Sequence, residues 1–335
     1  MADWVIVVDD DISNLKIAGH ILSRNGMRVT ALKSGTALLN YLEKNESPDI
    51  CLLDIKMPGM DGFQTLKELR KREKPGHELP VIFLTADDSE EAETAGLSLG
   101  AMDFITKPFV PDVLTLRVRH SIDLIRLQRN LSQLVELKTE ENRKLFIHVV
   151  SALAAAIDAK DPYTNGHSAR VAEYTKEIAK RYGYTEKQQE DIYVAGLLHD
   201  VGKIGIPDAI INKPSKLTDE EFEIIKTHPA MGARILETIK EMPSLSEGAR
   251  WHHEKFGGGG YPDGLAGEKI SEFARIIAVA DSYDAMASRR SYRDVLPQNV
   301  VREEIEKGKG TQFDPKFADI MLQMIDEDKN YTMKE

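Results

Sequence analysis

The chain has one cysteine, Cys51, among its 335 residues, so it can form no disulfide bond within itself. Its apolar runs are too short to span a membrane. Its first residues lack the basic start and apolar core of a signal peptide. We therefore expect a cytoplasmic protein without membrane insertion, because a reducing compartment fits a chain without disulfides. Cys51 lies in the apolar run Ile50–Leu53, where we expect a buried side chain rather than a reactive thiol.

Positive charge is also scarce. The chain has 55 acidic and 44 basic residues, which gives a formal net charge of -11. Non-specific binding to nucleic acid needs a basic surface, so we expect no direct nucleic-acid binding. The length allows two domains, each large enough to bury a core.

Short apolar runs alternate with amphipathic stretches through residues 1–125. The predicted strands are Val5–Val8, Arg28–Ala31, Ile50–Leu53, Val81–Thr85 and Asp103–Thr106. The predicted helices between them are Ser13–Arg24, Gly35–Lys44, Asp61–Arg72 and Glu90–Leu99. Such alternation indicates an α/β fold, in which helices cover both faces of a parallel sheet. Functional groups in these folds gather at the carboxyl ends of the strands.

Polar residues occupy these strand ends. They are Asp9, Asp10, Asp54, Thr85 and Lys107. Three carboxylates at one edge repel each other unless a hard cation such as Mg²⁺ binds among them. We therefore expect a cation site there.

Four strings in this half resemble the response-regulator receiver domain, which has a doubly wound, flavodoxin-like fold. They are Asp9-Asp10, Asp54–Gly62, Thr85-Ala86 and Lys107-Pro108. The resemblance implies that Asp54 is the phosphoacceptor for a sensor histidine kinase, and that Asp9, Asp10, Asp54 and the Lys56 carbonyl bind Mg²⁺. It also implies that Thr85 and Lys107 bind the phosphoryl oxygens and that Phe104 is an aromatic switch. Two alternatives remain open: a flavodoxin-like domain with incidental acids, and a receiver that is never phosphorylated.

Leucines then recur at coiled-coil spacing. Leu124, Leu127, Leu131 and Leu134 are separated by three, four and three residues. Two heptads are fewer than a firm assignment needs. We expect residues 126–145 to form a helical linker that packs against a second copy of the chain. The alternative is a monomeric helix lying on its own domain.

Residues 146–335 have a mostly helical pattern, which predicts an all-α domain. A new apolar stripe among small residues predicts close helix packing at its start: Phe146, Val149, Val150, Leu153 and Ile157. Further on, Thr218 and Glu221 predict a capping box. The helix that starts there is predicted to end at His228, because Pro229 disfavours its continuation.

Five of the nine histidines form one candidate set with two aspartates of this half. The seven residues are His167, His199, Asp200, His228, His252, His253 and Asp281. A lone histidine on an apolar helix face is usually a core residue, but seven such residues on several helices predict a polynuclear metal site. Imidazole and carboxylate ligands bind Fe or Mn, and two close ions can stabilise both oxygens of a phosphoryl displacement. The sequence therefore predicts a phosphohydrolase.

A set of strings in this half resembles the HD-GYP family, a branch of the HD phosphohydrolases. They are His167–Val171, His199–Gly205, His228–Gly232, His252–Glu254, Gly260–Pro262, Asp281, Arg290–Arg293 and Gly310–Pro315. The family is helical and hydrolyses cyclic di-GMP with iron or manganese. Some members carry a glutamate at the position of Tyr163 and bind a third metal, so two Fe or Mn ions are expected here.

The resemblance also implies roles for single residues. One metal would be bound by His167, His199, Asp200 and Asp281, and the other by His228, His252 and His253, with Asp200 bridging. Asp200 and Lys203 would be catalytic, and Lys203 would reach the scissile phosphate. The other implied substrate contacts are Asp161, Tyr261, Arg290 and Arg293.

Together these features predict phosphorylation-regulated hydrolysis of cyclic di-GMP to linear pGpG or GMP by a hydroxide that bridges two metals. Two alternatives remain open. One is a cyclic-dinucleotide sensor or protein-recruiting module with little turnover, and the other is a phosphodiesterase for a different cyclic dinucleotide.

Overall fold

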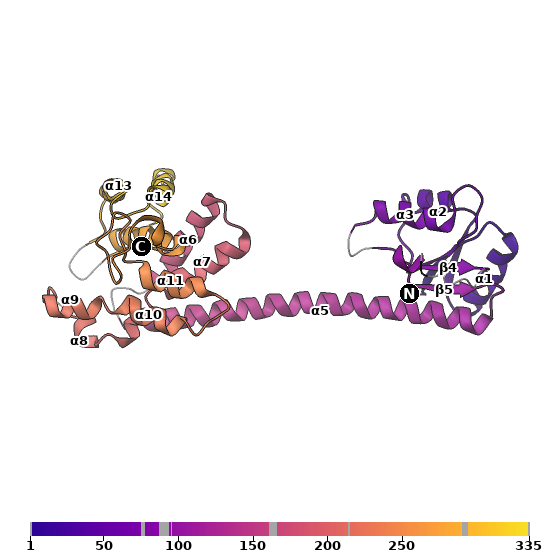
Figure 1. Ribbon diagram of the computed structural model, residues 1–335, viewed down its shortest axis with the longest axis horizontal. Coiled ribbons are helices and arrows are strands. Elements are labelled where there is room, and N and C mark those ends of the chain that lie inside the picture. Colours follow the sequence, from indigo (N-terminus) through magenta and orange to yellow (C-terminus); the bar gives the residue numbers. More distant parts are fainter. Residues whose placement is uncertain are drawn as a thin grey trace. The chain divides into compact units, whose positions relative to one another are not determined.

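The computed structural model describes residues 2–74, 78–86, 94, 96–160, 166–213, 215–289 and 294–333, and Figure 1 labels many of its elements. The chain divides into two compact units, Met1–Thr139 and Glu140–Glu335. In the described part of the chain, no helix combines the length and hydrophobicity needed to cross a lipid bilayer. The separate assignment of residues 126–145 as a linker stays a prediction.

The first unit contains a five-stranded parallel sheet in the order β2-β1-β3-β4-β5. Its strands are β1 (Trp4–Val8), β2 (Arg28–Leu32), β3 (Ile50–Asp54), β4 (Val81–Thr85) and β5 (Asp103–Thr106). Each predicted strand is confirmed to within one residue at either end. The doubly wound, flavodoxin-like α/β fold is thereby confirmed.

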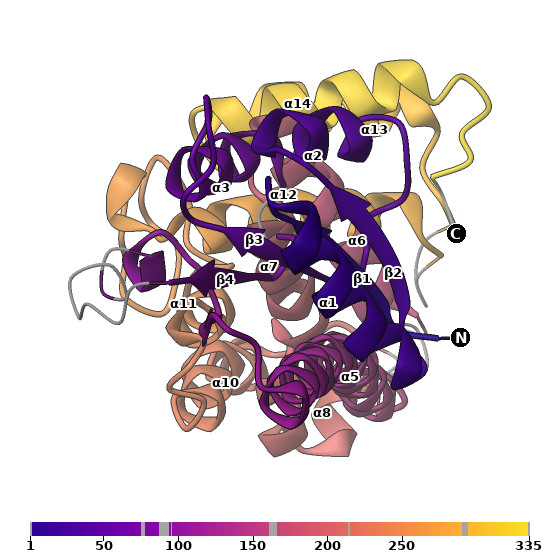
Figure 2. The same ribbon diagram turned by 90° about the vertical axis from the view of Figure 1, so that its right-hand side faces the viewer.

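Helices cover both faces of this sheet, as Figure 2 shows. Helix α1 (Ile12–Arg24) and the first turns of α5 pack on one face, and α2 (Gly35–Leu42) and α3 (Gly62–Arg72) pack on the other. The chain reverses its direction across the sheet between β1 and β3, which are neighbours. The carboxyl ends of these two strands therefore lie side by side. The predicted helix Glu90–Leu99 lies mostly outside the described residues.

Helix α5 runs without interruption from Pro111 to Asp158. The leucine seam Leu124, Leu127, Leu131 and Leu134 is 50–65% exposed. The predicted second stripe is divided between two faces of the helix. Val150 and Ile157 are buried in the core of the second unit, whereas Phe146, Val149 and Leu153 are exposed.

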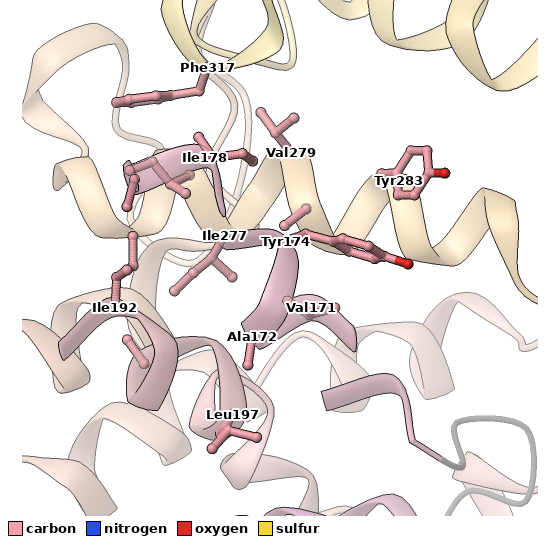
Figure 3. Packing of buried hydrophobic residues seen from close by; sticks show 14 of the residues in the cluster. Val171, Ala172, Tyr174, Ile178, Ile192, Leu197, Ile277, Val279, Tyr283 and Phe317 are labelled. Atoms are coloured by element: carbon pink, nitrogen blue, oxygen red, sulfur yellow. The ribbon is translucent and has the colours of Figure 1, made fainter. Parts of the chain in front are cut away.

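The second unit is built from helices. After α5 these are α6 (His167–Tyr182), α7 (Glu186–Leu198), η1 (Val201–Gly205), α8 (Asp208–Ile211), α9 (Asp219–Ile225), α10 (His228–Leu236), α11 (Pro243–Trp251), η2 (Gly267–Lys269), α12 (Glu272–Ala287), α13 (Gln298–Gly308) and α14 (Pro315–Glu327). The core lies between α6, α7 and α12, where Ile178, Ile192 and Ile277 pack together (Figure 3). This packing fixes three of the helices that carry or precede predicted metal ligands.

The structure corrects one helix boundary near the site. The capping box of Thr218 and Glu221 is confirmed, but α9 ends at Ile225 and His228 begins the next helix, α10. Pro229 lies in the first turn of α10, where the missing N–H is no loss because first-turn N–H groups have no partner within the helix. The proline therefore marks a helix start and not, as predicted, a helix end.

Candidate metal centre

The structure brings the seven histidine and aspartate side chains of the second unit together. His167 begins α6, His199 and Asp200 follow α7, His228 begins α10, His252 and His253 follow α11, and Asp281 lies in α12. Their potential ligand atoms form two groups, in each of which all atoms lie within 4.8 Å of one another. One group is Asp200, His228, His252 and His253, and the other is His167, His199 and Asp281. The adjacent histidines His252 and His253 thus belong to the same group.

Hydrogen bonds fix how the histidine rings are turned. His199, His228 and His252 each have Nδ1 2.7–2.9 Å from the backbone carbonyl three residues earlier. A carbonyl can only accept, so Nδ1 carries the proton and Nε2 of the neutral ring has a free lone pair. His167 Nδ1 lies 2.7 Å from Asp284 Oδ2. All four rings therefore present Nε2 to the centre of the site.

The two oxygens of Asp200 face different histidines. Oδ1 lies 3.1 Å from His228 Nε2 and 3.7 Å from His252 Nε2, whereas Oδ2 lies 3.4 Å from His199 Nε2 and 3.9 Å from His167 Nε2. Among the described residues, Asp200 Oδ1 and His199 Nε2 are buried atoms without a hydrogen-bond partner. Buried lone pairs that face each other are unfavourable unless a cation lies between them. The donor set thus fits two divalent ions that share Asp200.

The carboxylates of the site are held in the charged form. Burial alone would raise the pKa of Asp200, but Lys203 and His199 outweigh burial and hold it well below its usual value. Burial would also raise the pKa of Asp281, but His167 and His199 outweigh burial and lower it. Metal ligands must be deprotonated, so both aspartates are ready to bind a cation.

The histidines differ in their protonation. Burial lowers the pKa of His252. Burial, together with the neighbouring His252 and His228, holds the pKa of His253 well below its usual value. Both rings are therefore neutral. Burial also favours neutral His167, but its hydrogen bonds to Asp281 and Asp284 outweigh burial and raise its pKa to about 9. A metal must therefore displace a proton from His167.

Asp284 supports His167 and was not singled out from the sequence. Its buried carboxylate bonds His167 Nδ1 and also accepts from Arg170 Nε at 2.7 Å and Ser288 Oγ at 3.1 Å. A carboxylate behind a histidine ligand orients the ring and increases its basicity. The available signal was the spacing of Asp281 and Asp284, because residues three apart share a helix face.

The receiver residues meet at the carboxyl ends of β1 and β3. Asp9, Asp10 and Asp54 can place oxygens within 4.8 Å of one another, which suits Mg²⁺. Lys107 Nζ lies 2.7 Å from both Asp9 Oδ2 and Asp54 Oδ1. Burial raises the pKa of Asp54, and this outweighs the opposite effect of Lys107. Lys107 therefore stands between the two buried carboxylates.

The remaining receiver residues lie close to this edge. Thr85 is buried at the end of β4, and exposed Lys56 follows β3. Phe104 is buried against Phe83, with ring centroids 5.6 Å apart. Cys51 is fully buried in β3 and burial raises its pKa, so the prediction of an unreactive thiol is confirmed.

Comparisons with known proteins identify a family of domains for each half of the chain. Residues 5–119 match the response regulator receiver domain, and residues 151–317 match the HD domain. The cyclic di-GMP phosphodiesterase response regulator RpfG of Xanthomonas campestris is 32% identical, over 95% of this chain and 86% of its own length. The chain belongs to the HD-domain response regulators. A cyclic di-GMP phosphodiesterase of Thermotoga maritima is 34% identical, over 96% of this chain and 90% of its own length.

One further relative of this HD-domain response regulator has a different named substrate. A 3'3'-cGAMP-specific phosphodiesterase of Vibrio cholerae is 40% identical over 200 residues, which are 59% of this chain and 37% of that protein. An HD domain implies a hydrolase that depends on divalent metal ions, in agreement with the donor set.

A cleft of about 420 Å³ opens at the metal centre. It is lined by His167, Asp200, Lys203, His253, Asp281, Ser282, Ala285, Met286, Glu304, Gln312 and Phe313. The ammonium group of Lys203 pairs with Asp200. Gln312 belongs to the string Gly310–Pro315, to which the sequence assigned no role in the site. Glu304 was missed, because it lies more than 100 residues beyond His199 and no local pattern connects the two.

The predicted substrate contacts are only partly described. Tyr261 stacks on His253, with ring centroids 4.8 Å apart and an interplanar angle of 27°. Asp161, Arg290 and Arg293 lie outside the described residues, as does Tyr163. A side chain at Gly260 would collide with the backbone of His253 and the two residues after it. The glycine-rich loop before Tyr261 therefore lies directly against the backbone of His253–Lys255.

Proposed function

We propose that this phosphodiesterase hydrolyses cyclic di-GMP to pGpG or GMP with two Fe or Mn ions. The observation that supports this most directly is the position of Asp200, whose two oxygens face two separate sets of histidine Nε2 atoms. Relatives that match most of the chain are named cyclic di-GMP phosphodiesterases.

The chain's own residues orient the substrate and stabilise charge. Two bound ions would lower the pKa of a water molecule and neutralise charge on the phosphoryl group. We assign His167, His199, Asp200 and Asp281 to one ion and His228, His252 and His253 to the other, with Asp200 shared. Lys203 lines the cleft beside Asp200. A compact ammonium there can donate to a non-bridging phosphoryl oxygen, whose charge grows in the transition state.

Other groups would bind the bases and the second phosphate. Tyr261, stacked on His253, offers an aromatic surface suited to a guanine ring. We assign Asp161, Arg290 and Arg293 to substrate contacts on the family resemblance alone. A mixed guanine–adenine cyclic dinucleotide is the second candidate substrate, because a relative that matches the helical domain is named for it. A pure sensor is disfavoured by the complete donor set.

The enzyme assignment is tested by anaerobic turnover with Fe(II) or Mn(II), with cyclic di-GMP and 3'3'-cGAMP compared at equal concentration. We expect cyclic di-GMP to be hydrolysed and Asp200→Ala to lose at least about 1000-fold in kcat, since it removes the shared ligand and the partner of Lys203. The metal content of Asp200→Ala should fall below two ions per chain. Turnover of 3'3'-cGAMP alone would transfer the assignment to the mixed dinucleotide. Binding without turnover at full metal occupancy would favour the sensor.

For the front half we propose phosphorylation of Asp54 by a sensor histidine kinase. Mg²⁺ bound by Asp9, Asp10, Asp54 and the Lys56 carbonyl would assist the transfer. Thr85 and Lys107 would bind the phosphoryl oxygens and Phe104 would respond to the change. We also propose that the leucine seam of α5 packs against a second copy of the chain.

A further inference from the structure

Lys160, two residues after the end of α5, reaches the short helix that carries Lys203. Its Nζ lies 3.3 Å from the carbonyl oxygen of Lys203 and 3.0 Å from those of Ile204 and Ile206. An ammonium group has three N–H donors, so the number of donors equals the number of carbonyls. Carbonyls at the end of a helix carry partial negative charge, and the carbonyl of Lys203 also accepts from the backbone N of Ile206 at 3.0 Å. Lys160 thus acts as a side-chain cap for η1.

Asp158, the last residue of α5, makes a second contact of this kind. Its buried carboxylate accepts from the backbone N of Ser168 at 3.1 Å and from Ser168 Oγ at 2.6 Å. Ser168 directly follows His167, the metal-ligand candidate at the start of α6. Asp158 and Lys160 therefore hold segments that carry His167 and Lys203, respectively.

The end of α5 is itself firmly attached to the helical core. Val150, Ala154 and Ile157 are buried there. By contrast, η1 has only five residues, and 3₁₀ helices have weaker hydrogen-bond geometry than α-helices. The position of Lys203 therefore depends on contacts from outside η1, and Lys160 supplies three of them.

We propose that Lys160 is a positioning residue, which sets the place of Lys203 over the metal centre from the end of α5. Asp158 does the same for His167. The catalytic part of this inference rests on the proposed function, in which Lys203 contacts the phosphate. A displacement of about 1 Å in a positioned group can reduce catalysis by about 100-fold. A change at the end of α5 would thus reach two residues that line the cleft, His167 and Lys203.

Lys160→Met in the full chain tests this, because methionine keeps a similar stem and removes all three donors. The matched control is Asp208→Asn. Asp208 Oδ1 lies 3.2 Å from Lys160 Nζ, but this side chain is 73% exposed, and exposed ion pairs contribute little. We compare deuterium uptake of the backbone amides of residues 199–206, metal content, kcat and KM.

For Lys160→Met we expect faster amide exchange in η1, unchanged metal content, kcat lowered at least about 10-fold and KM within about 2-fold of the wild type. Asp208→Asn should behave as the wild type. Unchanged exchange in η1 overturns the proposal, and faster exchange with unchanged kcat overturns its catalytic part.

If the wild type does not hydrolyse cyclic di-GMP, the exchange comparison still supports or overturns the Lys160 contact, so failure of the proposed function is recognised separately. If Lys160→Met does not fold, Ser168→Ala tests the second contact, because it removes only the hydroxyl donor to Asp158. We then expect faster exchange at the start of α6 and a lower kcat, and an unchanged exchange rate there overturns the inference.

Discussion

His167 stands between two requirements. As a metal ligand it must be neutral, whereas hydrogen bonds to Asp281 and Asp284 favour its charged form and raise its pKa to about 9. Metal ions and protons therefore compete for this ring. The same carboxylates attract a metal ion. In the metal-free protein, the proton on His167 therefore supplies part of the positive charge that a bound ion would provide.

We predict that the affinity of the metal-free protein for Mn(II) falls as the pH is lowered from about 9 to 6.5, and that uptake releases protons in this range. Because the folded pKa of His167 lies above the ordinary histidine value of 6.5, the stability from its charged form is present below pH 6.5. That contribution is lost as the pH rises through 9. Titration calorimetry in buffers of different ionisation enthalpy measures both affinity and proton release.

Asp284→Asn is the control for this prediction. It removes one of the carboxylates that raise the pKa of His167, so the pH dependence should become flatter. The affinity at pH 9 should fall about 10–100-fold, because the ring loses its supporting carboxylate. A Mn(II) affinity that is independent of pH in the wild type would contradict the assignment of His167 as a ligand.

At this scale the sequence supports a candidate ligand set but not its surroundings. Five of nine histidines with two aspartates form an unusual pattern, which pointed to the seven side chains that the structure brings together. Asp284 and Glu304 could not be assigned in the same way. Their relation to the site depends on how α12 and α13 pack, and an isolated acidic residue on a helix has no signal of its own.

At the scale of elements, the close packing of η1 on α10 fixes the metal centre. Gly202 lies in η1, and a side chain there would collide with the carbonyl of His228 and the backbone N of Gly232. This contact holds η1, which follows Asp200, against the helix that begins with His228. Position 202 requires glycine because there is no room for a side chain. The backbone conformation does not require it, because Gly202 does not have a positive φ.

We predict that Gly202→Ala lowers the free energy of unfolding by about 1–3 kcal/mol, as expected for overpacking, and lowers the number of metal ions bound. Gly19→Ala, in α1, is the matched control because no atom lies within 4 Å of the added methyl group. Chemical denaturation and elemental analysis measure the two effects. If Gly202→Ala kept the free energy of unfolding and the metal content of the wild type, then η1 and α10 could move apart without loss of stability, which would contradict this prediction.

Element boundaries were predictable where the local signal was strong. Strands β1, β3 and β4 are almost wholly buried and read as nearly continuous apolar runs, so the sequence located them to within one residue. The start of α9 was given by its capping box, but its end was not. Pro229 is compatible with both a helix end and a first turn, and only the packing of His228 toward Asp200 decides between them.

At the scale of the whole molecule, α5 belongs to both units and carries an apolar seam in water. Leu124, Leu127, Leu131 and Leu134 are at least half exposed, which is costly for large apolar side chains. A second copy of the same seam would bury them in a parallel coiled coil. The sequence predicted the spacing, but it could not decide between a partner chain and the chain's own domain.

We predict that the wild type is a dimer and that Leu131→Glu shifts it to the monomer. The dissociation constant of the dimer should rise at least about 100-fold, because a charge enters the seam. Gln133→Glu adds the same charge on the exposed face of the same turn and should remain dimeric. Sedimentation velocity over a range of concentrations distinguishes the two. A monomeric wild type would contradict the role of the seam.

We expect the receiver to act as a switch. In the described structure Lys107 is shared between Asp9 and Asp54, so a phosphoryl group on Asp54 must compete for it. We expect the new oxygens to draw Lys107 and Thr85, because charge-assisted hydrogen bonds to phosphate are strong. Phe104, packed on Phe83, would then adjust at the neighbouring strand.

Beryllofluoride with Mg²⁺ mimics the phosphoryl group on Asp54. We predict that it changes either turnover of cyclic di-GMP or the monomer–dimer equilibrium of the full chain. Asp54→Asn should not respond, since it cannot form the adduct. Thr85→Ala should bind beryllofluoride but respond less, because one donor to the new oxygens is lost. Equal turnover and equal association with and without the adduct would show that the receiver does not control this enzyme, even though its acidic cluster is complete.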